Sequence, residues 1–70
     1  MAKRVDIQVE GGMGFYQFVG LTGRGLRWLK ANLCAEPWQW TGGGIACAVE
    51  GREYAMDIAA GAKAEGLTVR

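Results

Sequence analysis

Two charged clusters contain the residue types that could do chemistry in this 70-residue chain. The first consists of Glu50, Glu53 and Asp57, and two of its members, Glu53 and Asp57, are four residues apart. On a helix that spacing puts them on one face, where carboxylates could serve acid–base chemistry or hold a weakly bound divalent cation. Acidic residues near a helix start are also favoured by the helix dipole, and this explanation requires no reaction.

The second cluster places Trp28 among the cations Arg24, Arg27 and Lys30. Tryptophan and arginine are frequent anchors of protein interfaces. The same set could also bind nucleic acid, with cations on phosphates and the indole stacked on a base. The third interpretation is a solvated helix face on which Arg24 rests against Trp28 as a cation–π pair. We predict that these four residues form a binding site.

Other residue types that commonly take part in catalysis are few in this chain. The chain has no histidine and no serine, which removes the commonest general base, metal ligand and nucleophile. Cys34 and Cys47 have no CxxC spacing, and we expect them to be small buried apolar residues. We therefore predict that the protein is not an enzyme and uses no metal or cofactor.

The glycine-rich stretches at 20–26 and 41–44 could in principle cradle a phosphate. A phosphate loop lies between a strand and a helix start and continues into a lysine followed by serine or threonine. TGGG at 41–44 is expected between two strands, and GLTGRGL at 20–26 lacks the motif's ending. We interpret both as turns and caps, with an anion at the helix start near Gly23 as the weaker alternative.

The length and composition predict one domain over residues 1–70, with half of the residues apolar and 21% charged. No stretch has the length of a signal peptide's apolar core or of a membrane span, so we expect a cytoplasmic protein. Residues 1–34 carry five cations and two acids, whereas residues 35–70 carry three cations and five acids. This weak complementarity of charge leaves a homodimer open.

Sequence periodicity predicts the order β-β-α-β-β-α, with a short final strand as an option. The expected strands cover 5–10, 15–21, 38–40, 45–49 and 67–69, and the expected helices cover 23–33 and 52–65. Paired strands with helices between them predict an α+β domain. Its small, mostly antiparallel sheet should have the helices packed on one face.

Local signals fix several details of these elements. Thr22 is a natural N-cap for the first helix, and Gly66 is placed to end the second one, with Leu67 making the closing apolar contact. Leu26, Leu29 and Leu33 define the buried stripe of the first helix.

The three tryptophans are expected in different surroundings. Trp28 falls more than about 90° from the centre of the leucine stripe, so we expect it on the outer face of its helix. Trp38 and Trp40 should share one face of a strand. We expect Trp40 in the core under a helix and Trp38 partly exposed.

A resemblance adds to this reading. The segments Gly20-Leu21-Thr22, Arg27-Trp28-Leu29, Trp40 with Gly42-Gly43, residues 48–54 and the ending 61–69 resemble short reading frames of phages and mobile elements of proteobacteria. The resemblance covers about residues 20 to 69 and brings no catalytic signature. This chain departs from the usual pattern of those reading frames at two positions. Thr41 stands where an aromatic residue is common, and Glu53 separates Arg52 from Tyr54.

The resemblance implies a small accessory protein that binds a partner stoichiometrically in the host cell, in the manner of inhibitors of CRISPR defence. We therefore expect a partner that is a larger host protein complex, contacted through Arg24, Arg27, Trp28 and Lys30. Two alternatives remain: a nucleic-acid-binding accessory protein that uses the same helix, and a homo-oligomeric assembly subunit. No membrane partner is expected.

Overall fold

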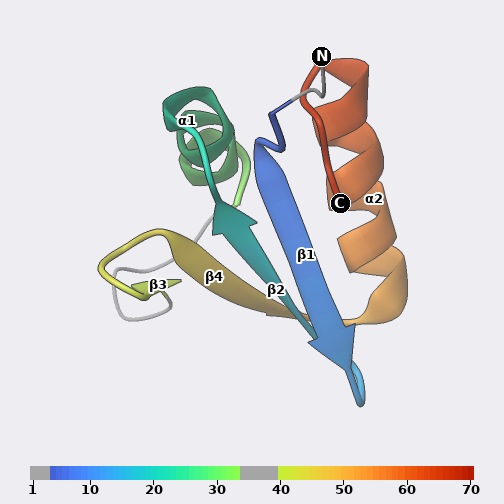
Figure 1. The fold of residues 1–70 in the computed structure, drawn as a ribbon. Coiled ribbons are helices and arrows are strands. Elements are labelled where there is room, and N and C mark those ends of the chain that lie inside the picture. The colour runs from blue at the N-terminus through green and yellow to red at the C-terminus, as the bar shows by residue number, and fades with distance from the viewer. Residues whose placement is uncertain (1–3, 34–39) are drawn as a thin grey trace.

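A computed structural model describes residues 4–33 and 40–70 (Figure 1). It contains four strands and two helices in the predicted order. The strands are β1 (Ile7–Gly12), β2 (Phe15–Gly20), β3 (Trp40–Thr41) and β4 (Ala46–Glu50), and the helices are α1 (Gly23–Asn32) and α2 (Arg52–Ala64).

The four strands form one antiparallel sheet in the order β1-β2-β4-β3. The register aligns Val9 with Phe18 and Phe18 with Cys47, so these side chains lie on the same face. The buried core joins this face to Leu29 of α1 and Ile58 of α2. Both helices therefore pack on one face of the sheet, and the predicted α+β class is confirmed.

The β1–β2 hairpin closes through Met13 and Gly14, both with positive φ (55° and 88°), as in the tight turns that suit twisted hairpins. The four-residue connection at 11–14 expected from the sequence is therefore too long, because Gly11 and Gly12 belong to β1. A Cβ on Gly11 would collide with ring atom Cδ1 of Tyr16. The tyrosine ring thus covers the backbone of Gly11, and any larger residue there would displace it.

The C-terminal segment lies along the outer edge of β1. Val69 forms a parallel bridge with Ile7, and this single bridge stands where the optional final strand was expected. Thr68 C=O accepts from Ile7 N–H at 3.1 Å, Arg70 N–H donates to Ile7 C=O at 3.0 Å, and Arg70 C=O accepts from Val9 N–H at 2.6 Å. The first half of the β1 edge is therefore paired.

Both predicted caps are confirmed. Thr22 Oγ1 accepts from Gly25 N–H at 3.1 Å, which satisfies one of the free donors at the start of α1. At the end of α2, Gly66 has φ +87°, and Leu67 N–H returns to Ala62 C=O at 3.1 Å. This is the Schellman arrangement, with Leu67 buried against the core.

The alternation of Ile45, Cys47 and Val49 and the helical spacing of Tyr54, Ile58 and Ala62 predict side chains that point inward, and two of these positions are wrong. Ile45 precedes β4 and is 40% exposed, whereas Cys47 is buried and Val49 is partly buried. The glycine turn at 42–44, all three with positive φ, ends one residue later than expected. Tyr54 is 50% exposed because Ala55, Ile58 and Ala62 form the buried stripe of α2.

The strand expected at 38–40 is found as Trp40–Thr41. Trp40 is half-buried and packs against the edge of the core, so its predicted inward direction is right although it is less enclosed than expected. Trp38, Pro37 and Cys34 lie outside the described residues. Within residues 4–33 and 40–70, neither helix has the length and apolar character needed to cross a membrane.

Candidate functional site

The first predicted binding residue, Arg24, is engaged within the fold. Its Nε donates to Asp6 Oδ1 at 3.1 Å, and its terminal Nη2 donates to Asp6 Oδ2 at 3.0 Å and to Gly66 C=O at 3.0 Å. Arg24 therefore ties the start of α1 to β1 and to the end of α2. The predicted contact with Trp28 is replaced by this ion pair, because a bidentate carboxylate is a stronger partner than an exposed indole.

Asp6 is the centre of a fully satisfied polar cluster. Besides Arg24, its carboxylate accepts from Thr22 Oγ1 at 2.6 Å and from Thr68 N–H at 3.0 Å. These hydrogen bonds, led by the one from Arg24, hold the pKa of Asp6 far below its ordinary value of 3.8. They also raise the pKa of Arg24. The cluster joins three chain segments and leaves no free acceptor for catalysis, so we interpret it as structural.

Trp28 is not on the outer face, which corrects the sequence-based expectation. Its indole is half-buried and packs against the core. A Cβ on Gly61 would lie 3.4 Å from its ring atom Cζ2, so the ring rests against α2. Trp28 points away from the leucine stripe of α1, but α2 covers that side of the helix. The indole therefore packs between the two helices.

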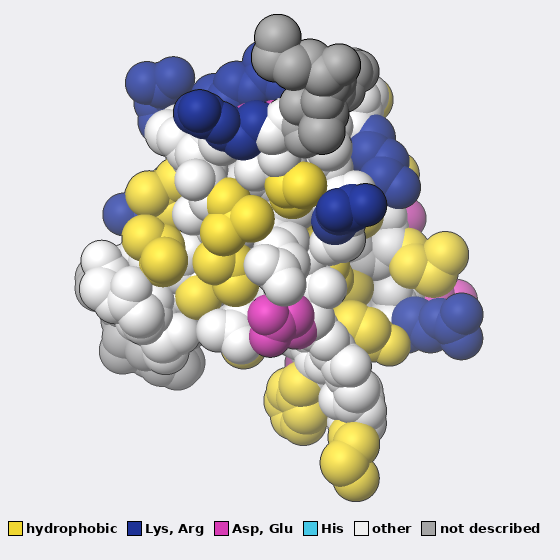
Figure 2. Space-filling model, in the orientation of Figure 1, with side chains coloured by type: hydrophobic (Ala, Val, Ile, Leu, Met, Phe, Trp, Pro, Cys, Tyr) yellow, Lys and Arg dark blue, Asp and Glu magenta, His cyan; other side chains and the backbone are white. Residues whose placement is uncertain are grey.

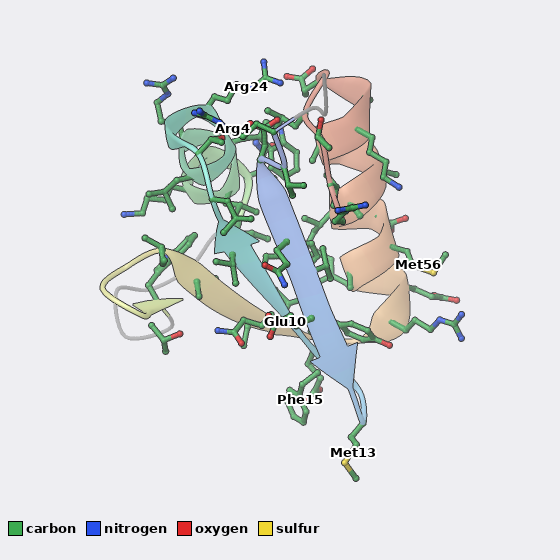
Figure 3. The ribbon with its side chains drawn as sticks, in the orientation of Figure 1. Arg4, Glu10, Met13, Phe15, Arg24 and Met56 are labelled. Carbon is green, nitrogen blue, oxygen red and sulfur yellow. The ribbon has the colours of Figure 1, made fainter. Side chains whose placement is uncertain are left out.

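Arg27 and Lys30 remain exposed on α1. Lys30 Nζ lies 5.5 Å from the centre of the Trp40 ring, within cation–π range. Of the four predicted binding residues, Arg24 and Trp28 make contacts within the fold, although the Arg24 side chain stays 58% exposed, and Arg27 and Lys30 face solvent. Arg4, also exposed, lies at the same end of the molecule as Arg24 (Figure 3).

The acidic cluster stays dispersed. Glu50, Glu53 and Asp57 are all exposed, and across residues 4–33 and 40–70 no three potential ligands stand close enough to hold a metal ion. Cys47, the free thiol of the described part of the chain, is buried, and burial raises its pKa. This keeps the thiol protonated and unreactive at neutral pH.

A surface that the sequence reasoning missed is the face of the sheet opposite the helices. Alternation along the strands directs Phe15, Gln17 and Val19 of β2 to this face. Leu21 follows Val19 at the same spacing, with 49% of its surface exposed. Figure 2 shows hydrophobic side chains gathered over β2 and the start of β4 on this side. We call Phe15, Val19 and Leu21 the open apolar face.

The turn end of this face is open to solvent, although Ala46, which pairs with Val19 on the same face, is buried. Phe15 is 57% exposed and Met13, at the turn, is completely exposed, and both project at the turn end of the hairpin (Figure 3). Antiparallel sheets with one solvated face normally alternate apolar and polar residues. The run Phe15-Tyr16-Gln17-Phe18-Val19 places apolar residues on both faces, which is the sequence signal that could have revealed this surface.

A groove on the other side of the sheet, between α2 and the edge of β1, is the second notable surface. Its volume is about 350 Å³, and its apolar floor includes Val9, Tyr16 and Val69. The cations Arg52, Lys63 and Arg70 line it as well.

Comparison with known proteins identifies no relative of this chain. No family model, curated protein or solved structure matches it.

Proposed function

We propose that this chain is a small binding domain that acts by occupying a surface of a larger protein. The open apolar face carries the proposal. Three apolar residues on and beside one sheet face, Phe15, Val19 and Leu21, remain in contact with water, while both helices cover the opposite face. Contiguous exposed apolar surface of this kind is typical of interaction sites.

The composition of the face favours a protein over a nucleic acid as its partner. Nucleic-acid-binding sheets present several aromatic platforms together with cations. Here Phe15 is the sole aromatic residue directed outward from β1, β2 and β4, and the acidic Glu10 and Glu50 lie on the same face. An aromatic anchor with aliphatic neighbours matches the apolar centre of a protein interface.

The resemblance of residues 20–69 to reading frames of phages and mobile elements supports a proposal about the setting. In that setting the partner is a host protein complex, and stoichiometric occupation would inhibit it, as CRISPR inhibitors do. Arg24, Arg27 and Lys30 of the predicted set are all exposed, but Arg24 is held by Asp6, which leaves Arg27 and Lys30. We retain them as residues that orient the partner through charge, with the open apolar face as the anchor.

The experiment is a capture from proteobacterial lysate with three immobilised forms of the chain. These are the unmodified chain, the double variant Phe15→Ser/Leu21→Ser, and the control Tyr54→Ser, which changes an aromatic residue of similar exposure on α2. The unmodified chain and the control should retain the same protein, in a stoichiometric complex when both are purified. The double variant should lose it while keeping its circular dichroism spectrum.

Each other outcome contradicts the proposal in a recognisable way. Retention of nucleic acid that falls steeply and log-linearly with salt would identify a nucleic-acid-binding protein. A concentration-dependent oligomer of the unmodified chain that the double variant lacks would assign the face to self-assembly. Undiminished capture of the protein by the double variant would remove the open apolar face from the site.

A further inference from the structure

The groove beside α2 combines an apolar floor with an exposed strand edge. Val9 and Tyr16 form part of the floor from the helix-facing side of the hairpin, and Ala59 contributes a small side chain from α2. The small residue keeps the groove open between helix and strand. The volume of about 350 Å³ lies in the range of sites that enclose small ligands or a few side chains.

The edge of β1 along this groove is only partly paired. Ile7 and Val9 direct their N–H groups toward the C-terminal segment. In an antiparallel strand every second residue points its backbone groups the same way, so Gly11 also directs its N–H and C=O to this edge. Residues 67–70 pair no further than Val9. Among the described residues, Gly11 N–H and C=O therefore lack a backbone partner on this side.

The charged side chains that line the groove all have one sign. Arg52 and Lys63 are eleven residues apart on α2, which is three turns, so both side chains lie on the same side of the helix. Arg70 adds a third cation from the C-terminal segment. The acidic residues Glu53 and Asp57 lie roughly 90 to 130° further around α2, and neither lines the groove.

We propose that the groove binds an extended acidic peptide segment, which adds to the free edge of β1 as a further strand. Its backbone would pair with Gly11, one or two apolar side chains would fill the groove, and its carboxylates would meet Arg52, Lys63 and Arg70. This mode of recognition takes affinity from backbone hydrogen bonds and specificity from alternate side chains.

The spacing of the cations selects a peptide over a lipid or another amphiphile with one anionic group. Eleven residues of helix separate Arg52 from Lys63 by roughly 16 Å at about 1.5 Å per residue. About five residues of extended strand cover the same length. A ligand with a single headgroup could neutralise one of these cations, whereas a peptide with alternating carboxylates reaches both.

The test uses synthetic peptides, so it does not depend on the partner of the open apolar face. Three fluorescein-labelled seven-residue probes are titrated by fluorescence anisotropy: alternating glutamate and valine, alternating lysine and valine, and the glutamate peptide with N-methyl groups on alternate residues. The glutamate peptide should bind at least tenfold more tightly than either other probe. N-methylation removes the backbone donors and leaves the side chains and charges of the peptide unchanged.

Variants then locate the site. Arg52→Glu/Lys63→Glu should weaken binding of the glutamate peptide at least tenfold, whereas Arg27→Glu, a matched charge reversal on α1, should change it less than twofold. In NMR spectra of the unmodified chain, the amide signals of Gly11 and Gly12 should shift on titration. Circular dichroism of each variant checks that the fold is retained.

Four results would overturn the proposal. Equal binding of the N-methylated peptide would exclude strand addition, and equal binding of the lysine peptide would exclude charge recognition. Binding of oleate in the groove with no binding of the glutamate peptide would assign it to lipids. Loss of peptide binding in Phe15→Ser/Leu21→Ser, with Arg52→Glu/Lys63→Glu unaffected, would move the peptide to the open apolar face.

Discussion

Phe15 and Phe18 stand three residues apart in the same strand, yet one is 57% exposed and the other completely buried. Phe18 points into the layer of two helices and contacts the core. Phe15 points to the opposite side, where no described element of the fold covers it. The two residues have the same chemistry and differ only in which face of β2 they occupy.

This difference separates stability from binding. The covered face supplies the buried area on which a chain of this size depends, whereas the open apolar face adds little to the free energy of unfolding. An exposed aromatic residue that the fold does not use is available to another molecule. The following predictions sharpen the comparison or would abolish it.

The largest effect is expected for Phe18→Ala. Truncating a buried phenylalanine costs about 3 to 5 kcal/mol, and a chain of this length has a free energy of unfolding of roughly 4 to 10 kcal/mol. The variant should therefore be partly or largely unfolded at 37 °C, as measured by urea denaturation followed by circular dichroism. A loss below about 1 kcal/mol would show that the helix-covered face is not the core.

A smaller loss is expected for Gly25→Ala, where α1 approaches the strand layer most closely. A Cβ there would collide with the backbone oxygen of Asp6, so the helix must shift at a cost of about 1 to 3 kcal/mol. Gly23→Ala is the control, because nothing lies within 4 Å of its added Cβ. It should be neutral or stabilising by up to about 1 kcal/mol, and equal losses in both would contradict the close approach.

Acid should weaken the fold through Asp6. Its pKa is lower in the folded chain than its ordinary value of 3.8, so protons bind the unfolded state more tightly and protonation favours unfolding. The contribution of Asp6 is complete above about pH 5 and declines as the pH falls through about 4 toward the lowered pKa.

The measurement is the urea midpoint of Asp6→Asn between about pH 5 and pH 2.5, the range in which the Asp6 carboxyl group of the unfolded chain takes up its proton. The amide introduced by this substitution does not titrate, so the variant should start from a lower midpoint and lose less of it over this range than the unmodified chain. Glu10→Gln, which changes an exposed carboxylate on the same face as Phe15, is the control. Parallel slopes for Asp6→Asn and the unmodified chain would exclude the cluster as the acid-sensitive element.

The smallest effect on stability is expected for Phe15→Ser. Surface substitutions away from buried groups usually change the free energy of unfolding by less than about 0.5 kcal/mol, and Phe15 contacts water over most of its surface. The same variant should weaken partner binding at least tenfold in isothermal titration calorimetry with the captured partner. A stability loss close to that of Phe18→Ala would show that the two faces are equivalent.

Features fixed by neighbouring residues could be predicted from the sequence. The Thr22 cap and the Gly66 ending depend on contacts within five residues, and alternation in β1 and β2 identifies the hairpin. The element order follows from these local signals, which is why the α+β class could be predicted.

Features that depend on distant segments could not be predicted. Asp6 and Arg24 are eighteen residues apart, and Asp6 and Thr68 are sixty-two apart. Nothing in the spacing of these residues indicates that they meet. The burial of Trp28 depends on where α2 lies, so its place relative to the leucine stripe of α1 could not determine its exposure. The groove likewise forms only when residues 67–70 return to β1.

The hydrogen bond between Asp6 and Thr68 can form only late in the synthesis of the chain. During synthesis, at about 5 to 20 residues per second, β1 leaves the ribosome seconds before residues 67–70 are made. Until then the outer edge of β1 is unpaired and the Asp6 carboxylate lacks the N–H of Thr68. Contacts so distant along the chain slow folding, and an open strand edge is a site for association with other chains. The nascent chain should therefore be most prone to aggregation just before residues 67–70 emerge.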